Sequence, residues 1–83
     1  MPHHLVIRFE PGHIHRIRNF GEELYHALKE DGWGSITLQD IDRATTEMCV
    51  AVHVKRRVRR ISNLILRMLE KHNLASIASL AES

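Results

Sequence analysis

Several residue types are scarce in this sequence, and each shortage excludes a class of protein. Its 83 residues include one cysteine, Cys49, so no disulfide can form within the chain, and a single thiol is typical of a reducing compartment. No apolar run approaches the ~20 residues that a membrane-spanning helix needs, so we expect no membrane partner. The N-terminus lacks the charged and then apolar pattern of a secretory signal. We therefore expect a cytoplasmic protein.

Glycine and proline are also scarce, with 4 and 2 residues, and no repeat, linker or low-complexity segment divides the chain. A chain of this length has room for one hydrophobic core, so residues 1–83 are predicted to form a single domain. Such a domain buries only a little over ~60% of the surface that its unfolded chain exposes. Self-association is a common way for a small domain to bury more.

The spacing of apolar residues predicts the order strand, helix, strand, strand, helix, with a further element at the C-terminus. Alternating apolar residues predict strands at about residues 3–10, 35–40 and 47–55. A 3.6-residue rhythm predicts helices at about residues 13–30 and 56–72. Residues 41–46, between the second and third strands, are predicted to form a polar turn. The tail, residues 75–83, fits a helical turn or a fourth strand, and we favour the strand.

The same periods predict which side chains are buried. The strand residues expected to face the helices are Leu5, Ile7, Phe9, Ile36, Leu38, Met48, Val50, Val52 and Val54. The first helix is expected to bury Ile14, Ile17, Gly21, Leu24, Tyr25 and Leu28, and the second Val58, Ile61, Ile65, Met68 and Leu69. A mid-helix glycine costs ~1 kcal/mol relative to alanine. We therefore expect Gly21 to let its helix approach the sheet closely.

This order of elements resembles that of small stand-alone ferredoxin-like domains, also called α/β plaits. The resemblance covers nearly the whole chain and depends on element order and spacing, not on a sequence motif. It implies an α+β fold, a βαββα(β) sandwich with antiparallel sheet order 4-1-3-2 and both helices packed on one face. It assigns no functional residue, because this fold hosts many unrelated functions.

If the helices cover one face of the sheet, strand alternation defines the residues of the other face. The predicted contact residues on this open face are His4, Val6, Arg8, Thr37, Cys49, Ala51 and His53, with Gln39 beside them. Small residues lie near the centre and polar ones around them, which suits a partner but is equally typical of a solvated antiparallel face. From this face we predict a small non-catalytic protein-interaction or regulatory module. It is expected to bind a protein partner or to form a homodimer through its sheet.

Positive charge is concentrated although the formal net charge is only +2. Five of the twelve basic residues lie within six positions, namely Lys55, Arg56, Arg57, Arg59 and Arg60. The other seven face ten acidic residues, so the rest of the chain has a net charge of −3. This composition describes a mildly acidic domain with one basic patch.

RNA binding is an alternative function, because one face of the second helix could follow a phosphate backbone. Its basic residues are Arg56, Arg60, Arg67 and Lys71. RNA-binding plaits, however, place aromatic rings on the open strands for bases to stack on, whereas the predicted open face here has no phenylalanine, tyrosine or tryptophan. We therefore expect a solvated stripe, partly neutralised by Glu70 and by carboxylates of the first helix or second strand.

A third interpretation is enzymatic. The start Met-Pro-His-His-Leu-Val-Ile is similar to that of tautomerase-superfamily proteins. That resemblance implies that Pro2, exposed by removal of Met1, acts as a general base while Arg8 or Arg43 binds an anionic substrate. It covers only the first few residues.

Other chemistry lacks the spacing that it needs. The chain has 7 histidines but no Cys-x-x-Cys or His-Glu-x-x-His motif, so we expect no metal and no cofactor. His4 and His53 are expected to be neighbours on the open face, and His72 to pack on the apolar face of its helix. Cys49 and His53 lie about 13 Å apart along one strand, too far for a nucleophile and its base, so no catalytic residue is predicted.

Overall fold

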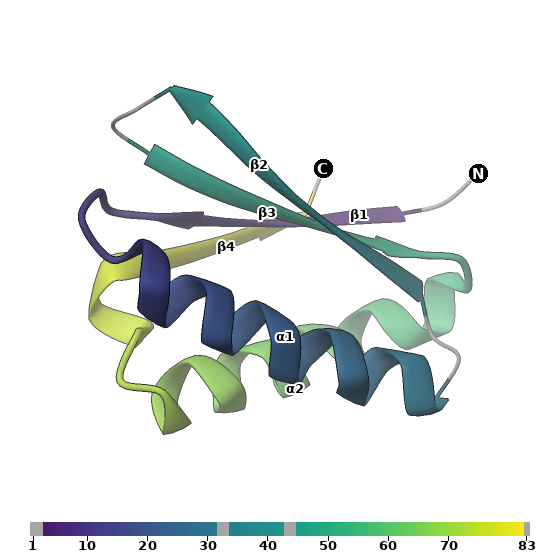
Figure 1. Ribbon diagram of the computed structural model, residues 1–83. Coiled ribbons are helices and arrows are strands. Elements are labelled where there is room, and N and C mark those ends of the chain that lie inside the picture. Colours follow the sequence, from purple (N-terminus) through teal and green to yellow (C-terminus); the bar gives the residue numbers. More distant parts are fainter. Residues whose placement is uncertain (1–2, 32–33, 43–44, 83) are drawn as a thin grey trace.

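A computed structural model describes residues 3–31, 34–42 and 45–82, with side chains described for 3–30 and 46–82. The elements are β1 (His3–Phe9), α1 (Ile14–Asp31), β2 (Gly34–Asp42), β3 (Thr45–Val52), α2 (Val58–Lys71) and β4 (Ala78–Glu82). Short 3-10 helices lie at Lys55–Arg57 and Ala75–Ile77. Figure 1 shows two layers, with both helices on the same side of the sheet. Neither helix of the described chain has the length and apolarity that crossing a bilayer requires.

The sheet has four strands in the order β2-β3-β1-β4, and each neighbouring pair is antiparallel. The predicted order 4-1-3-2 is the same order, counted from the opposite edge of the sheet. The C-terminal tail combines the two structures considered for it, because a 3-10 turn precedes β4. An α+β domain with two helices on one face of an antiparallel sheet is compatible with a ferredoxin-like fold.

The hairpin of β2 and β3 is longer than predicted. Residues 41–46 were expected to form a turn, but β2 continues to Asp42 and β3 begins at Thr45. The register shifts between Asp40 and Asp42, which marks a β-bulge. A bulge accommodates an extra residue while pairing continues, so the strands extend through a polar segment.

β3 ends earlier than predicted, at Val52 and not at about residue 55. Val52 pairs with His3 of β1 and with Gly34 of β2, and these are the first described residues of their strands. Beyond Val52 the chain bends at residues 53–54 and enters the 3-10 helix at Lys55–Arg57, so it leaves the sheet. Val54 is 37% exposed, so the prediction that it belongs to the core is wrong.

The core lies between the sheet and the helices and follows the predicted periods closely. The residues expected to be buried together, and found so, are Leu5, Ile7, Phe9, Met48, Val50, Val52, Leu24, Ile61 and Ile65. Ile36 and Leu38 lie outside the described side chains. Tyr25 is 45% exposed, because it follows the buried Leu24 by one residue, which places it ~100° farther round the helix. Phe20 is fully buried and was missed, although it lies three residues after Ile17.

Helix α2 ends in a Schellman motif, which brings one further residue into the core. Asn73 has a φ of 58°, and its N–H donates to the carbonyl of Glu70. The N–H of Leu74 donates to the carbonyl of Leu69 at 2.8 Å, and both leucine side chains are buried. This pairing of hydrogen bonds with an apolar contact is the usual form of the motif. It confirms the predicted helix stop and explains the burial of Leu74.

Close packing of α1 on the sheet depends on Gly21. A Cβ atom at this position would lie 2.8 Å from Cε of Met48, which is a core residue of β3. The expected close approach is therefore confirmed. The absence of a side chain at Gly21 leaves the space that Met48 occupies.

Ile65→Ala is expected to lower the free energy of unfolding by about 2–5 kcal/mol, because it leaves a cavity at a fully buried position. Leu66→Ala is the matched control. Leu66 is the next residue along α2 and is 47% exposed, so this variant should lose only about 0.5 kcal/mol of unfolding free energy. Urea unfolding followed by circular dichroism measures both. Equal losses in the two variants would contradict the burial described for α2.

Candidate functional site

The face of the sheet opposite the helices is open (Figure 1). On the central strands β1 and β3, the residues that alternate with core positions are half-buried or exposed. They are His4, Val6 and Arg8 on β1, and Glu47, Cys49 and Ala51 on β3. The structure places the residues expected there on these two strands at this face, with the exception of His53.

A band of small and apolar residues crosses the middle of this face. Val6 lies opposite Cys49 on β3 and opposite Ala81 on β4. Cys49 pairs in register with Thr37 of β2, whose side chain lies outside the described part. Ala51 lies opposite His4 and extends the band along β3. The side chains in the middle of this face are therefore short and mostly apolar.

Beside this band lies a charged pair. Nε of Arg8 donates to Oε2 of Glu47 at 2.8 Å, and the two residues are cross-strand partners. The Glu47 side chain is only 14% exposed, whereas that of Arg8 is 70% exposed. An ion pair open to solvent adds at most about 1 kcal/mol to stability. Its main effect is that the two charges cancel, so the described part of this face is close to neutral.

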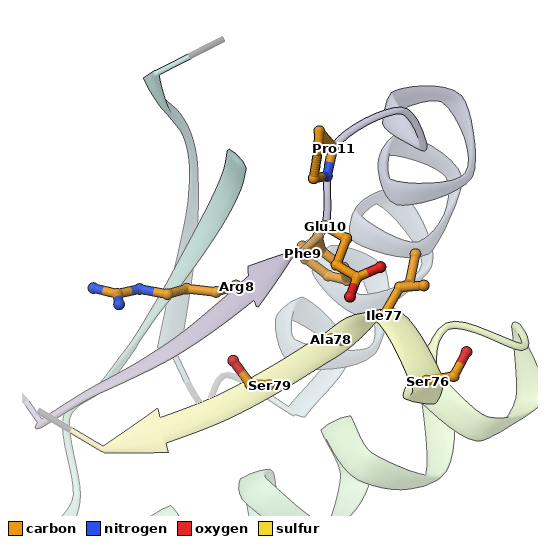
Figure 2. A pocket seen from close by; sticks show the side chains of 8 residues that line it. All are labelled: Arg8, Phe9, Glu10, Pro11, Ser76, Ile77, Ala78 and Ser79. Carbon is orange, nitrogen blue, oxygen red and sulfur yellow. The ribbon is translucent and has the colours of Figure 1, made fainter. Parts of the chain in front are cut away.

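The open face also has a shallow hollow of about 400 Å³, lined by Val6, Arg8, Glu47, Ser79 and Ala81. A second hollow of about 300 Å³ lies where β1 leaves the sheet beside the start of β4. Its lining is Arg8, Phe9, Glu10, Pro11, Ser76, Ile77, Ala78 and Ser79 (Figure 2). In Figure 2 the Arg8 side chain points away from Glu10 and Ile77. Neither lining contains a histidine or a cysteine, so neither hollow holds a Cys–His or Ser–His pair.

Three residues of this site were not predicted. Glu47 precedes Cys49 by two positions, so strand alternation alone would have found it. Ser79 and Ala81 lie on β4, whose short and weakly patterned sequence left the tail ambiguous. His53 was predicted to lie beside His4 on β3, and this is wrong because β3 ends at Val52. His53 is exposed at the bend that follows.

The predicted basic residues lie on the outer side of α2 and on the turn before it. Arg56, Arg60, Arg67 and Lys71 are all exposed. Nζ of Lys71 lies 4.0 Å from Oε2 of Glu23 on α1, so a carboxylate of the first helix partly neutralises the stripe, as expected. Pro2 and Arg43, named for a tautomerase, lie outside the described residues.

His72 packs between the helices, as predicted. Its ring meets Phe20 edge-on with centroids 5.7 Å apart, and its Nε2 lies 2.7 Å from Oε2 of Glu23. Nη2 of Arg16 donates to the carbonyls of His72 and Asn73 at 3.2 and 2.8 Å. These contacts join α1 to the end of α2. Elsewhere in the described chain, no three histidine, cysteine, aspartate or glutamate side chains gather as a metal site would require.

Solved structures show the same fold, whereas no protein-family model and no curated protein matches this sequence. A protein of unknown function from Nitrosomonas europaea superposes with a TM-score of 0.69 and 12% identity, covering 99% of this chain and 86% of that chain. A Mycobacterium tuberculosis protein gives 0.65 and 9%, covering 100% and 93%.

A third neighbour is a conserved Bacteroides thetaiotaomicron protein of unknown function, named a possible oxidoreductase. Its TM-score is 0.64 at 12% identity, covering 99% of this chain and 93% of that chain. At such identities the likeness shows the fold alone. It agrees with a small stand-alone α/β domain.

Glu23→Gln is expected to destabilise the fold at neutral pH but not in acid. The hydrogen bond from His72, and then the charges of His72 and Lys71, lower the pKa of Glu23 below its ordinary value of 4.5 despite some desolvation. A carboxyl whose pKa is lowered by folding stabilises the fold above its unfolded pKa, and this stabilisation is lost as pH falls through the folded pKa.

Thermal melts from neutral pH to below 4.5 should therefore show the gap between wild type and Glu23→Gln closing in acid. Glu22→Gln, at the exposed neighbouring position, is the control and should follow the wild type throughout. A gap for Glu23→Gln that is independent of pH would contradict the role given to the carboxylate.

Proposed function

We propose that this chain is a small non-catalytic protein-interaction module of the cytoplasm that self-associates as a homodimer through the open face of its sheet. The observation that carries the proposal is the band of Val6, Cys49, Ala51 and Ala81 across the described strands. These residues are small or apolar, and their positions on the face follow from the strand register. Small apolar side chains favour removal from water and allow a copy of the same face to pack closely.

The size of the molecule supports a contact of this type. It measures 33 × 24 × 18 Å along its principal axes. Covering the open face would give a small domain the additional burial that its size favours.

Charge also favours a second copy as the partner. A two-fold contact brings the same surface from both subunits together, so that surface must complement itself. The Arg8–Glu47 pair supplies one cation and one anion side by side. Two copies can therefore approach without net repulsion. The single cysteine agrees with the reducing conditions of the cytoplasm.

The two alternatives have less support. RNA binding depends on the exposure of Arg56, Arg60, Arg67 and Lys71, and the described open face offers no phenylalanine, tyrosine or tryptophan for a base to stack on. A tautomerase mechanism needs an arginine to bind an anionic substrate, and Arg8 is already paired with Glu47.

Val6→Glu is expected to convert the dimer into a monomer, because it would bury a carboxylate of each copy in the contact. Light scattering after gel filtration measures the mass. Ala81→Glu tests the same face from the exposed edge strand, where it does not threaten the fold. Leu66→Glu, an equally drastic change on the helix side, is the matched control and should stay dimeric. A wild type that remains monomeric, or dimers in all three variants, would overturn the proposal.

Cys49 provides an independent measurement, since it is the sole thiol and lies half-buried in the centre of the band. In a dimer it is covered, so its reaction with a thiol reagent should slow as protein concentration rises. The Ala81→Glu variant should react at one rate at every concentration. Equal rates for the two proteins would place Cys49 outside the contact.

A further inference from the structure

The outer side of the second helix is a separate surface that self-association through the sheet would leave exposed. Both helices lie on the opposite side of the sheet from the open face (Figure 1). Residues 55–71 hold seven basic residues and one acidic residue, Glu70, whereas the rest of the chain holds five basic and nine acidic ones. Positive charge is therefore concentrated on one side of the molecule, at this turn and helix.

An aliphatic side chain lies within this positive surface. Leu66 is 47% exposed, while α2 buries Val58, Ile61, Ile65 and Leu69 against the core. The core therefore does not account for a leucine here. Leu66 lines a hollow of about 450 Å³ together with Arg60, Asn63, Arg67 and Glu70. An apolar side chain in a concave, basic setting is typical of a binding site, whereas a solvated helix face needs only polar residues.

The helical spacing shows how these residues are combined. Asn63 lies three positions before Leu66, so the two are neighbours on the helix surface, and Arg59 lies two turns before Leu66 on the same side. Arg67 follows Leu66 directly and is exposed. A ligand on this surface would meet an aliphatic contact with guanidinium groups around it and an amide within reach. Phosphate groups alone would use the cations and gain nothing from Leu66.

We propose that the outer side of α2 docks an acidic segment of a partner protein, which inserts an apolar side chain against Leu66. Carboxylates of the segment pair with Arg67 and Arg59, and the apolar side chain fills the hollow. This is the arrangement by which an amphipathic helix binds a groove, with anchors at i, i+3 and i+4. The positive field of residues 55–71 attracts such a segment and sets its orientation.

Two labelled peptides test the proposal on the full chain by fluorescence anisotropy. In the first, leucines recur at i, i+3 and i+4 among glutamates, and in the second each leucine is replaced by serine. The first should bind saturably at low salt and at least about tenfold more tightly than the second, because only it brings an apolar anchor. Its affinity should fall as salt rises, since charge pairing contributes to it.

Two pairs of variants locate the site. Leu66→Ser and Arg67→Glu should each weaken binding of the leucine peptide about tenfold or more. Tyr25→Ser and Arg18→Glu make the same changes at exposed positions of α1 and should leave it unchanged, with circular dichroism checking every fold. Tyr25 is a close match, because it is 45% exposed against 47% for Leu66.

The result that overturns the proposal is equally defined. No saturable binding of the leucine peptide, or binding that ignores Leu66→Ser, would remove it. Tighter binding of an oligouridylate than of the leucine peptide, lost in Arg67→Glu but kept in Leu66→Ser, would assign the surface to RNA instead. None of these outcomes depends on the sheet, since Ala81→Glu should bind the peptide as the wild type does.

Discussion

The alternation of side chains along β1 and β3 is the constraint on which the rest of the structure depends. These strands lie in the middle of the sheet, and on one face each buries apolar residues such as Ile7 and Val50 under the helices. Because a strand has a period of two, fixing the buried residues also fixes which ones face outward. A slip of one residue would bury Arg8 and expose Ile7. The core and the candidate interface are therefore two consequences of one register.

Much of the fold was predictable because its elements have strong periods. Alternation in β1 and β3 and the rhythm of α2 identify the core, and Asn73 marks the helix end. The ends of strands were less accessible, since they depend on partners that lie far away in the sequence. β3 stops at Val52, where the chain bends before the 3-10 helix at Lys55–Arg57. Nothing in the local sequence around Val54 contains that information.

The same distinction applies to the candidate site, where residues set by strand alternation were predictable and those set by distant contacts were not. Strand alternation places Val6, Arg8 and Cys49 correctly, and the same rule applied to Glu47 would have completed the charged pair. Ala81 was not predicted, because the tail was expected to be a strand without a register that would place its side chains on either face. The hollow at Leu66 also could not be predicted, because concavity is a property of neighbouring side chains in space and no sequence period expresses it.

The placement of both helices on one side of the sheet has a consequence for assembly. If two copies join through their sheets, each α2 points outward, away from the contact and from its counterpart. Such a dimer has two α2 surfaces on opposite sides. A single acidic segment cannot reach both of them, but two partner molecules can bind at the same time. For a partner carrying several copies of the segment, the second attachment would be intramolecular and would strengthen binding through effective concentration, with no new contact.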